Sequence, residues 1–309
     1  MPFIKETFTL QTPQNAIVFL QKELHLTQKE AQKFIDKGRV EHNGVIFTQK
    51  AGILQGKVTI SHFKPQDLGI KPIFETCDFA CFDKPPKLLS HPKGRFYHLS
   101  LLDAIRFLYG KNANPINRLD SETSGILLVS KHKKSEVILK NMFEKKAIEK
   151  CYLAVVFGKV CLKNLAQKSG ITITSPSTFL ISLNIKEGKM GGDLGIRSHI
   201  CKNGKVAQTM IKIISYCDSS DRTFLKIYPL TGRTHQIRVH LVAIGHRIVG
   251  ESLYGISDNV ARDFLDGKIK EAQRAEFFGA NRLLLHSQSL RFSYENNDFF
   301  IVSKMDFTP

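Results

Sequence analysis

The sequence predicts an α+β protein made of two units that a short linker joins. Strand-like stretches follow one another with few helices between them, which favours a largely antiparallel mixed sheet over alternating strands and helices. Residues 63–72 contain two prolines and a glycine and read as the linker. No period of about 20 to 50 residues repeats, which excludes a solenoid. We therefore expect a small unit over residues 1–62 and a larger one over residues 73–309.

The charge balance points to a polyanionic partner. The 309 residues include 45 Lys and Arg against 28 Asp and Glu, a formal net charge of +17. Nucleic acid and an anionic membrane surface both fit such an excess. No apolar run approaches the roughly 18 residues of a spanning helix, and the first residues lack the apolar core of a signal peptide. We expect a cytoplasmic protein that is not bound to a membrane.

The six cysteines are expected to be reduced packing residues. Without an export signal there is no reason to expect disulfides. The tightest pair, Cys77 and Cys81, has no second pair to complete a zinc site, so no metal is expected.

The N-terminal unit predicts two short helices followed by strands. Apolar residues recur at helical spacing from Ala16 to Leu24, and Thr27 with Glu30 forms a capping box that opens a helix from Gln28 to Asp36. An Asn-Gly turn at residues 43–44 then joins two strands. Basic residues in and just after these two helices are candidates for phosphate contacts, or simply form a solvated helix face. They are Lys22, Lys29, Lys33, Lys37 and Arg39.

The larger unit predicts a series of strands with two helices among them. The apolar run Ile126–Val129 is the clearest buried strand, and four glycines between Gly188 and Gly195 predict a mobile loop. The other expected elements are a strand over 73–82, helices over 100–109 and 131–146, paired strands over 206–215 and 224–230, and a last strand over 281–292.

Three stretches of this unit place polar side chains beside apolar strands. Arg118-Leu119-Asp120 follows a turn and precedes the strand at Ile126, and in an extended Arg-x-Asp the two charged side chains share a face. Taken alone, the triplet reads as a surface ion pair beside a hairpin, because short charged triplets are common. Lys150-Cys151-Tyr152 opens another strand, and Gly232 to His240 packs Arg, Thr, His and Gln into a turn that starts a helix.

Together the three stretches resemble the RluA-type RNA pseudouridine synthases. That family carries Arg-Leu-Asp before Thr-Ser-Gly, Lys-x-Tyr before a strand, and Gly-Arg-Thr-His-Gln-x-Arg-x-His, and all three occur here in order within residues 70–292. The chain departs from the family at four positions. Asn117 replaces a His, Lys87 a Gly, Arg247 a Pro and Glu251 an Asp. The N-terminal unit resembles the S4 RNA-binding domain, so the nearest likeness is to the RluC and RluD type.

The resemblance implies a pseudouridine synthase fold with a central basic cleft, and isomerisation of uridine in RNA without a cofactor. It assigns catalysis to Asp120 and an ion-pair partner to Arg238. It implies that the ring of Tyr152 presents a flat face to the extruded base. It also implies that Arg118 occupies the space in the RNA that the flipped nucleotide vacates. Residues Arg233, His235 and Gln236 would fix the cleft wall. The appended N-terminal unit favours large-subunit ribosomal RNA over transfer RNA, and we expect a monomer.

Two other functions remain open on the sequence alone. A non-catalytic RNA-binding protein explains the net charge and the N-terminal unit, but leaves the three stretches without a role. A hydrolase using Asp120 with His235 would need metal-ligand spacing or a nucleophile elbow, and the sequence contains neither.

Overall fold

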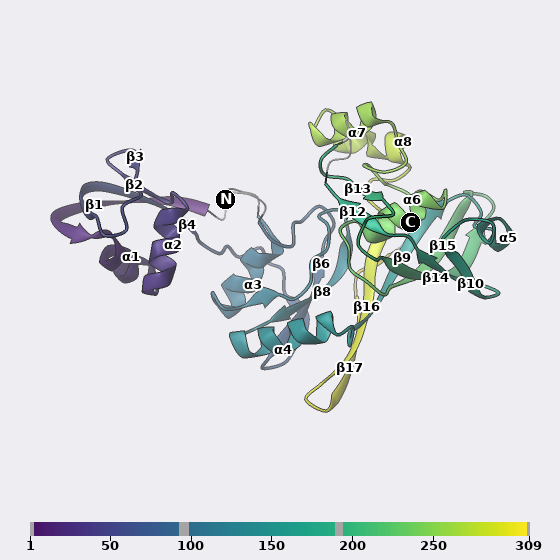
Figure 1. The fold of residues 1–309 in the computed structure, drawn as a ribbon, viewed down its shortest axis with the longest axis horizontal. Helices are drawn as coiled ribbons and strands as arrows, with labels where there is room; N and C mark the ends of the chain where they lie inside the picture. Colours follow the sequence, from purple (N-terminus) through teal and green to yellow (C-terminus); the bar gives the residue numbers. More distant parts are fainter. Residues whose placement is uncertain (1–2, 93–98, 189–193, 308–309) are drawn as a thin grey trace.

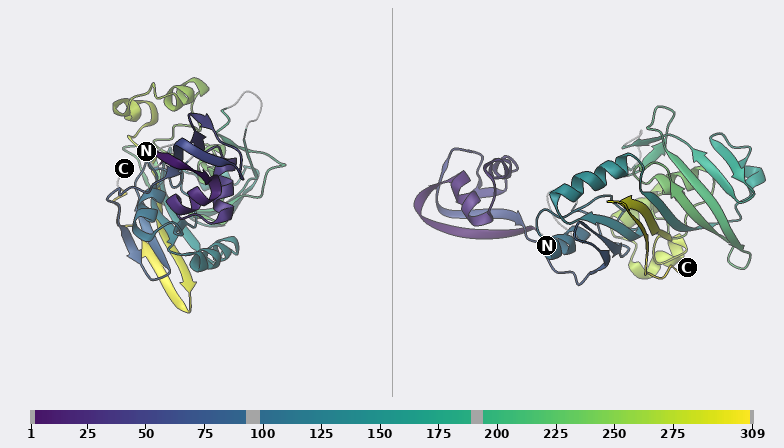
Figure 2. Two further views of the ribbon diagram at one scale, coloured as in Figure 1. Left: turned by 90° about the vertical axis from the view of Figure 1, so that its left-hand side faces the viewer. Right: turned by 90° about the horizontal axis from the view of Figure 1, so that it is seen from below.

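A computed structural model describes residues 3–92, 99–188 and 194–307. Its strands form a four-stranded sheet, an eleven-stranded sheet and a small two-stranded sheet. The four-stranded sheet and its two helices lie at one end of an elongated molecule, and the larger sheet with the remaining helices forms the rest (Figure 1, Figure 2).

The N-terminal unit is a curved sheet covered on one face by two helices. The helices are packed through apolar residues such as Phe19, Leu20 and Ile35 against Val58 and Ile60 of the sheet, all fully buried. The predicted capping box of Thr27 and Glu30 is present, because the side chain of each residue bonds the backbone N–H of the other. The strand order is β1-β4-β2-β3. The elements are β1 (Phe3–Asn15), α1 (Ala16–Leu24), α2 (Gln28–Asp36), β2 (Val40–His42), β3 (Val45–Ile46) and β4 (Ile53–Phe63).

The large sheet is mixed and mostly antiparallel, which confirms the predicted fold class. Its main path runs β10-β11-β14-β15-β9-β16-β8-β6-β5, with β17 paired to β16 and β7 to β8. Among these pairs only β8 with β16 is parallel in the described part of the chain. The strands are β5 (Pro72–Glu75), β6 (Phe79–Lys84), β7 (Asn114–Pro115), β8 (Ser124–Ser130), β9 (Glu149–Phe157), β10 (Ile171–Ser175), β11 (Thr178–Ser182), β14 (Gln208–Cys217), β15 (Arg222–Pro229), β16 (Leu285–Tyr294) and β17 (Asn297–Val302).

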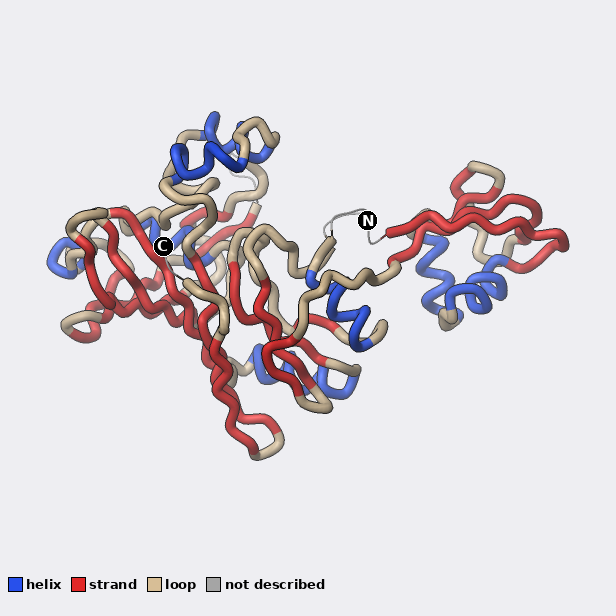
Figure 3. The backbone as a smooth tube through the Cα atoms, turned by 180° about the vertical axis from the view of Figure 1, so that it is seen from behind, coloured by secondary structure: helices blue, strands red, loops and turns tan. Residues whose placement is uncertain are grey.

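Helices cover parts of the large sheet, and one helical segment projects from it. Two helices lie beside the β6–β8 half, and a segment containing α7 and α8 stands off the body of the molecule (Figure 1, Figure 3). No helix in the described ranges is both long and apolar enough to cross a membrane. The remaining elements are α3 (Leu101–Tyr109), α4 (Lys133–Glu144), α5 (Leu162–Leu165), β12 (Ile185–Glu187), β13 (Ser198–Ile200), α6 (Gln236–Ala243), α7 (Asp258–Leu265), the 3₁₀ helix η1 (Glu271–Gln273) and α8 (Arg274–Phe278).

The single strand predicted over residues 73–82 is wrong, because this stretch is a hairpin of β5 and β6. The Thr76 hydroxyl accepts hydrogen bonds from the backbone N–H of Asp78 and Phe79, both at 3.2 Å, and so closes a tight turn. The apolar pattern of the sequence continues across this turn and therefore does not reveal it. Phe74 and Phe79, on either side of the turn, lie in contact, with ring centroids 6.0 Å apart.

The predicted mobile loop between Gly188 and Gly195 lies largely outside the described residues. The cysteine prediction is only partly right. Cys81 and Cys151 are buried, whereas Cys77 is exposed and the other three are half-buried. All six are free thiols.

Close packing between β8 and β16 fixes the start of β8. Gly125 pairs with Ser287 and has φ of +106°. A Cβ at this position would lie 2.2 Å from the Ser287 carbonyl oxygen, so only glycine fits. Every residue of β8 is buried, which makes the strand a rigid support for the loop that precedes it.

Candidate active site

An open cleft of about 1060 Å³ lies between the loop before β8 and the N-terminal end of α6. Its volume exceeds that of most small-molecule pockets, so it has room for a nucleotide and its neighbours. All four residues that the sequence predicted for the site line this cleft: Arg118, Asp120, Tyr152 and Arg238.

The loop that carries Asp120 is anchored on both sides of that residue. The Ser90 hydroxyl donates to the Leu119 carbonyl at 2.7 Å and accepts from the Leu119 N–H at 3.0 Å. The Lys84 ammonium donates to the Ser121 carbonyl at 3.0 Å. Asn117, which stands where the family usually has His, accepts from the Leu128 N–H at 3.2 Å and ties the loop to β8.

Lys84 is a fully buried lysine at the back of this loop. Its ammonium also donates to the carbonyls of Pro85 at 2.9 Å and Leu88 at 2.8 Å. Burial lowers the pKa of Lys84 to about 7, although the nearby carboxylates Asp120 and Glu122 favour its charged form. Lys87, which stands where the family usually has Gly, takes a left-handed conformation with φ of +68°.

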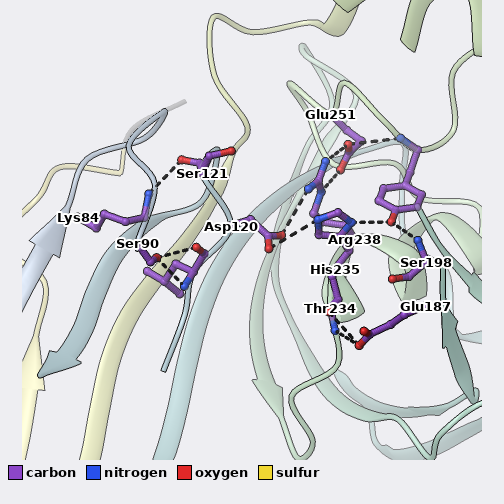
Figure 4. A network of polar contacts seen from close by, with 12 residues as sticks. Lys84, Ser90, Asp120, Ser121, Glu187, Ser198, Thr234, His235, Arg238 and Glu251 are labelled. Atoms are coloured by element: carbon purple, nitrogen blue, oxygen red, sulfur yellow. Dashed lines mark hydrogen bonds and ion pairs between the residues drawn. The ribbon is translucent and has the colours of Figure 1, made fainter. Parts of the chain in front are cut away.

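The Asp120 carboxylate faces the cleft, and its contacts with other described side chains are long (Figure 4). Its Oδ2 lies 3.4 Å from Arg238 Nη1, and its Oδ1 lies 3.7 Å from His235 Nε2. The side chain is 29 % exposed. Two nitrogen-bearing side chains therefore lie behind the carboxylate, and the opposite side is open to a ligand.

Arg238 is held firmly by a second carboxylate, Glu251. Arg238 Nε and Nη2 donate to the two oxygens of Glu251 at 2.7 Å and 2.5 Å, a bidentate pair (Figure 4). Glu251 is fully buried and also accepts from the Leu253 N–H at 2.8 Å. Burial alone would raise the pKa of Glu251, but the charge and hydrogen bonds of Arg238 lower it below its ordinary value.

His235, at the start of α6, is oriented by a contact with Tyr254. The Tyr254 hydroxyl accepts from the Ser198 N–H at 2.8 Å, and it lies 2.7 Å from His235 Nδ1. This contact fixes the orientation of the imidazole ring, and it directs Nε2 towards Asp120. The conformation of His235 is left-handed, with φ of +56°.

Gln236 ties the turn before α6 to β14. Its oxygen accepts from the Thr231 hydroxyl at 2.7 Å and from the Arg233 N–H at 3.0 Å. Its nitrogen donates to the Gln208 carbonyl and to the Thr209 hydroxyl, both at 2.9 Å. These four hydrogen bonds hold the turn that forms this side of the cleft.

Tyr152 supplies an aromatic surface to the cleft from β9. Burial raises the pKa of Tyr152 to about 12, the nearby Ser287 hydroxyl opposes this shift, and the charge of Asp120 adds to it. The phenol is therefore protonated throughout the physiological range. The face of such a ring can contact a planar base.

The remaining predicted residues are cations, and all but Arg39 are exposed. Arg118 is exposed at the cleft, and its charge helps to lower the pKa of Glu187, after hydrogen bonds from Thr234. Lys29, Lys33 and Lys37 are exposed on and just after α2, and Arg39 is half-buried with its guanidinium 5.3 Å from the Phe34 ring centroid. The unit that carries these four lies at the other end of the molecule from the cleft (Figure 1).

The sequence reasoning missed several residues that support the site. Ser90 and Lys84 act through the backbone of the Asp120 loop, and Tyr254 acts through His235. In the sequence, Glu251 was noted only because the family usually has Asp at this position. A carboxylate directly after Gly250 could have been read as the ion-pair partner of Arg238. Among the described residues, no group of three or more His, Cys, Asp or Glu is arranged to hold a metal ion.

Comparison with solved structures identifies the fold. The human RNA Pseudouridylate Synthase Domain Containing 1 matches with a TM-score of 0.58 at 22 % identity, over 80 % of this chain and 88 % of that one. The human Domain Containing 4 protein matches with a TM-score of 0.55 at 19 % identity, over 76 % of this chain and 88 % of that one. The chain has the pseudouridine synthase fold.

Sequence comparison shows the family. Residues 78–243 match the RNA pseudouridylate synthase family. An "Uncharacterized RNA pseudouridine synthase" of Helicobacter pylori (strain ATCC 700392 / 26695) is 43 % identical over 99 % of this chain and 95 % of the relative. The chain belongs to the RNA pseudouridylate synthase family, and it is an isomerase that acts on uridine in RNA.

More distant relatives carry names that specify an RNA. The "Ribosomal large subunit pseudouridine synthase C" of Rickettsia felis (strain ATCC VR-1525 / URRWXCal2) is 29 % identical, over 77 % of this chain and 67 % of the relative. The "tRNA pseudouridine(31) synthase" of Saccharomyces cerevisiae (strain ATCC 204508 / S288c) is 31 % identical, over 60 % of this chain and 46 % of the relative.

Proposed function

We propose that Asp120 is the catalytic residue and reacts with a uridine that has been turned out of its stack into the cleft. The position of its carboxylate supports this role, because it faces an open cleft while a permanent cation, Arg238, lies 3.4 Å behind it. In the reaction the N1–C1′ bond breaks and a C5–C1′ bond forms. C5 loses a proton and N1 gains one, so no electrons or groups are exchanged with a cofactor.

The other cleft residues bind the substrate in this proposal. Arg238 keeps Asp120 ionised and oriented, and the ring of Tyr152 contacts the extruded base. Arg118 is exposed at the cleft, and its long cationic side chain suits the gap left in the RNA by the flipped nucleotide. We infer a monomer that works in the cytoplasm.

Asp120→Asn tests the catalytic role. The amide keeps the shape of the side chain but removes the negative charge, so we expect pseudouridine formation to fall by about 10⁴-fold or more. Release of tritium from RNA containing [5-³H]uridine measures the reaction, and filter binding measures RNA affinity, which should be retained. Turnover within tenfold of wild type, about 1.4 kcal/mol of barrier, would refute the role of Asp120.

We propose large-subunit ribosomal RNA as the substrate. The name of the Rickettsia felis relative and the presence of an N-terminal basic unit favour it, while the yeast relative keeps transfer RNA as the alternative. Carbodiimide-based mapping of pseudouridine in total RNA, with and without this gene, decides between them. Loss of a site in large-subunit ribosomal RNA is expected, whereas loss only in transfer RNA would reject the proposal.

We also propose that residues 1–62 form an S4-like RNA-binding domain. Its basic surface is Lys29, Lys33, Lys37 and Arg39, of which the three lysines are exposed. Replacing all four by Gln should weaken RNA binding and reduce the salt slope by about 0.7 to 0.9 for each phosphate that is no longer neutralised. Replacing Lys5 and Lys50, whose ammonium groups pair with Glu41 and Asp36, provides a control within the same unit. Equal effects of the two sets would argue for general charge rather than a binding surface.

A further inference from the structure

The helical segment over residues 257–279, which contains α7, η1 and α8, borders the cleft through two apolar side chains. Phe264 and Leu265 at the end of α7 line the cleft, and the segment projects above the large sheet (Figure 1). The proposed reaction gives this segment no role.

A buried arginine connects this segment to the catalytic loop. Arg274, at the start of α8, is only 1 % exposed. Its Nη2 donates to Oε2 of Glu122, which stands two residues after Asp120, and its Nη1 lies 3.5 Å from Oε1 of Glu271. The guanidinium also lies 5.0 Å from the centroid of the Phe264 ring. Because a buried guanidinium cannot lose its proton, it needs such a partner, and Glu122 is therefore held in place.

The same segment is tied to both sides of the cleft. Lys87, in the loop after β6, pairs with Glu271, on the same side as Glu122. On the side of β13, Arg197 Nη1 lies 2.6 Å from Asp258 Oδ1 at the start of α7. These ion pairs make the segment a bridge between the wall that carries Asp120 and the wall that carries β13.

Asp120 depends on such supports because its own contacts are long. Its carboxylate has neighbours at 3.4 Å and 3.7 Å, beyond the range of a strong charged hydrogen bond. The position of the carboxylate is therefore set mainly by the backbone on either side. Ser90 holds residue 119, Lys84 holds residue 121, and Arg274 holds the side chain of residue 122.

We propose that Arg274 is a positioning residue which, through Glu122, aligns the Asp120 carboxylate with the uridine. This inference rests on the proposed catalytic role of Asp120. Arg274 does not touch the substrate in this account. It acts by fixing a loop in which a displacement of about 1 Å can cost about 100-fold in rate.

Single-turnover kinetics of Glu122→Gln and Arg274→Met test the proposal. We expect the rate of tritium release to fall about 10-fold to 100-fold, while RNA affinity changes by less than about threefold. Arg274→Lys keeps the charge but not the planar fork, and should recover part of the rate lost in Arg274→Met. Lys268→Gln is the matched control, because it removes an exposed pair with Asp263 in the same segment.

Two results would overturn the role of Arg274. One is a rate loss in Glu122→Gln no larger than that in Lys268→Gln. The other is a loss that follows the unfolded fraction, measured by circular dichroism, rather than the rate of folded enzyme. If Arg274→Met does not fold, Glu122→Gln alone decides between these outcomes. Asp120→Asn is measured in parallel. Full activity there refutes the catalytic proposal, whereas an inactive Asp120→Asn beside a fully active Glu122→Gln refutes only the positioning role.

Discussion

The turn around Glu251 and the loop around Asp120 present two carboxylates to the same guanidinium in very different ways. Glu251 is fully buried and bonds Arg238 at 2.5 Å and 2.7 Å, whereas Asp120 is 29 % exposed and lies 3.4 Å away. Glu251 also accepts from the backbone of its own turn. In contrast, the loop around Asp120 is anchored through its neighbours and leaves the carboxylate itself accessible.

The two carboxylates therefore have different tasks: Glu251 orients Arg238, and Asp120 stays accessible to a ligand. A bidentate buried pair fixes Arg238 in one geometry, and its desolvation cost is offset only while both partners remain. Once Arg238 is fixed, its remaining nitrogen can support Asp120 without binding it tightly. The buried carboxylate therefore serves mainly the architecture of the cleft, and the accessible one is free for the catalytic role that we propose for Asp120.

Removing Arg238 should have the largest effect, because it affects both carboxylates. Arg238→Met leaves Glu251 buried without its cation, and we expect the free energy of unfolding to fall by about 3 to 5 kcal/mol. Activity should be lost together with it. Urea denaturation followed by circular dichroism measures the stability. A loss below about 1 kcal/mol would mean that Glu251 has another way to satisfy its charge.

Neutralising the two carboxylates separately should split stability from activity. Glu251→Gln is expected to lower the free energy of unfolding by about 2 to 3 kcal/mol, since the ion pair with Arg238 is lost and the amide offers the guanidinium one accepting oxygen instead of two. Asp120→Asn should lower it by less than about 1 kcal/mol, as for a partly exposed pair. Both variants are compared by urea denaturation at neutral pH. Equal losses would contradict the contrast between the two regions.

Acid should reduce the stability that the ionised Glu251 contributes, because the pKa of Glu251 is lowered in the folded protein. A carboxyl group with a depressed folded pKa stabilises the fold above its unfolded pKa, about 4.3, and that contribution disappears as the pH falls through the lower folded value. The stability difference between wild type and Glu251→Gln should therefore narrow below about pH 4. Unfolding measured from pH 7 to pH 3 tests this, and a difference that grew in acid would reverse the assigned sign.

The smallest effect is expected for Tyr152→Phe. The ring remains as a surface for the base, so RNA affinity should stay within about threefold of wild type, and loss of the hydroxyl should change the free energy of unfolding by no more than about 1 kcal/mol. Tyr152→Leu removes the flat face and serves as the comparison. Equal RNA affinity in both variants would argue against contact between the ring and the base.

Local sequence patterns predicted elements well where one signal decides the structure. The Thr27–Glu30 capping box began α2 as expected, and the apolar run after Asp120 is the buried strand β8. Arg118, Asp120, Tyr152 and Arg238 were grouped by resemblance to a family, and all four line one cleft. Their roles in binding and catalysis stay predictions until they are measured.

The supports of the site were not predictable, because they are long-range and chemically ordinary. Ser90 meets Leu119 across 29 positions, and Arg274 meets Glu122 across 152. A serine or a surface-like ion pair carries no local pattern that reveals such a partner. The hairpin of β5 and β6 was missed for a related reason, since a threonine side chain closes its turn.

The parallel pairing of β8 with β16 affects the order in which the catalytic centre can form. Ser124 bonds His286 across 162 positions, and these two strands meet directly behind the Asp120 loop. Contacts so distant along the chain close slowly, because the intervening loop entropy must be overcome first. We therefore expect catalytic competence to appear late in refolding, after most secondary structure has formed and only once β16 has docked.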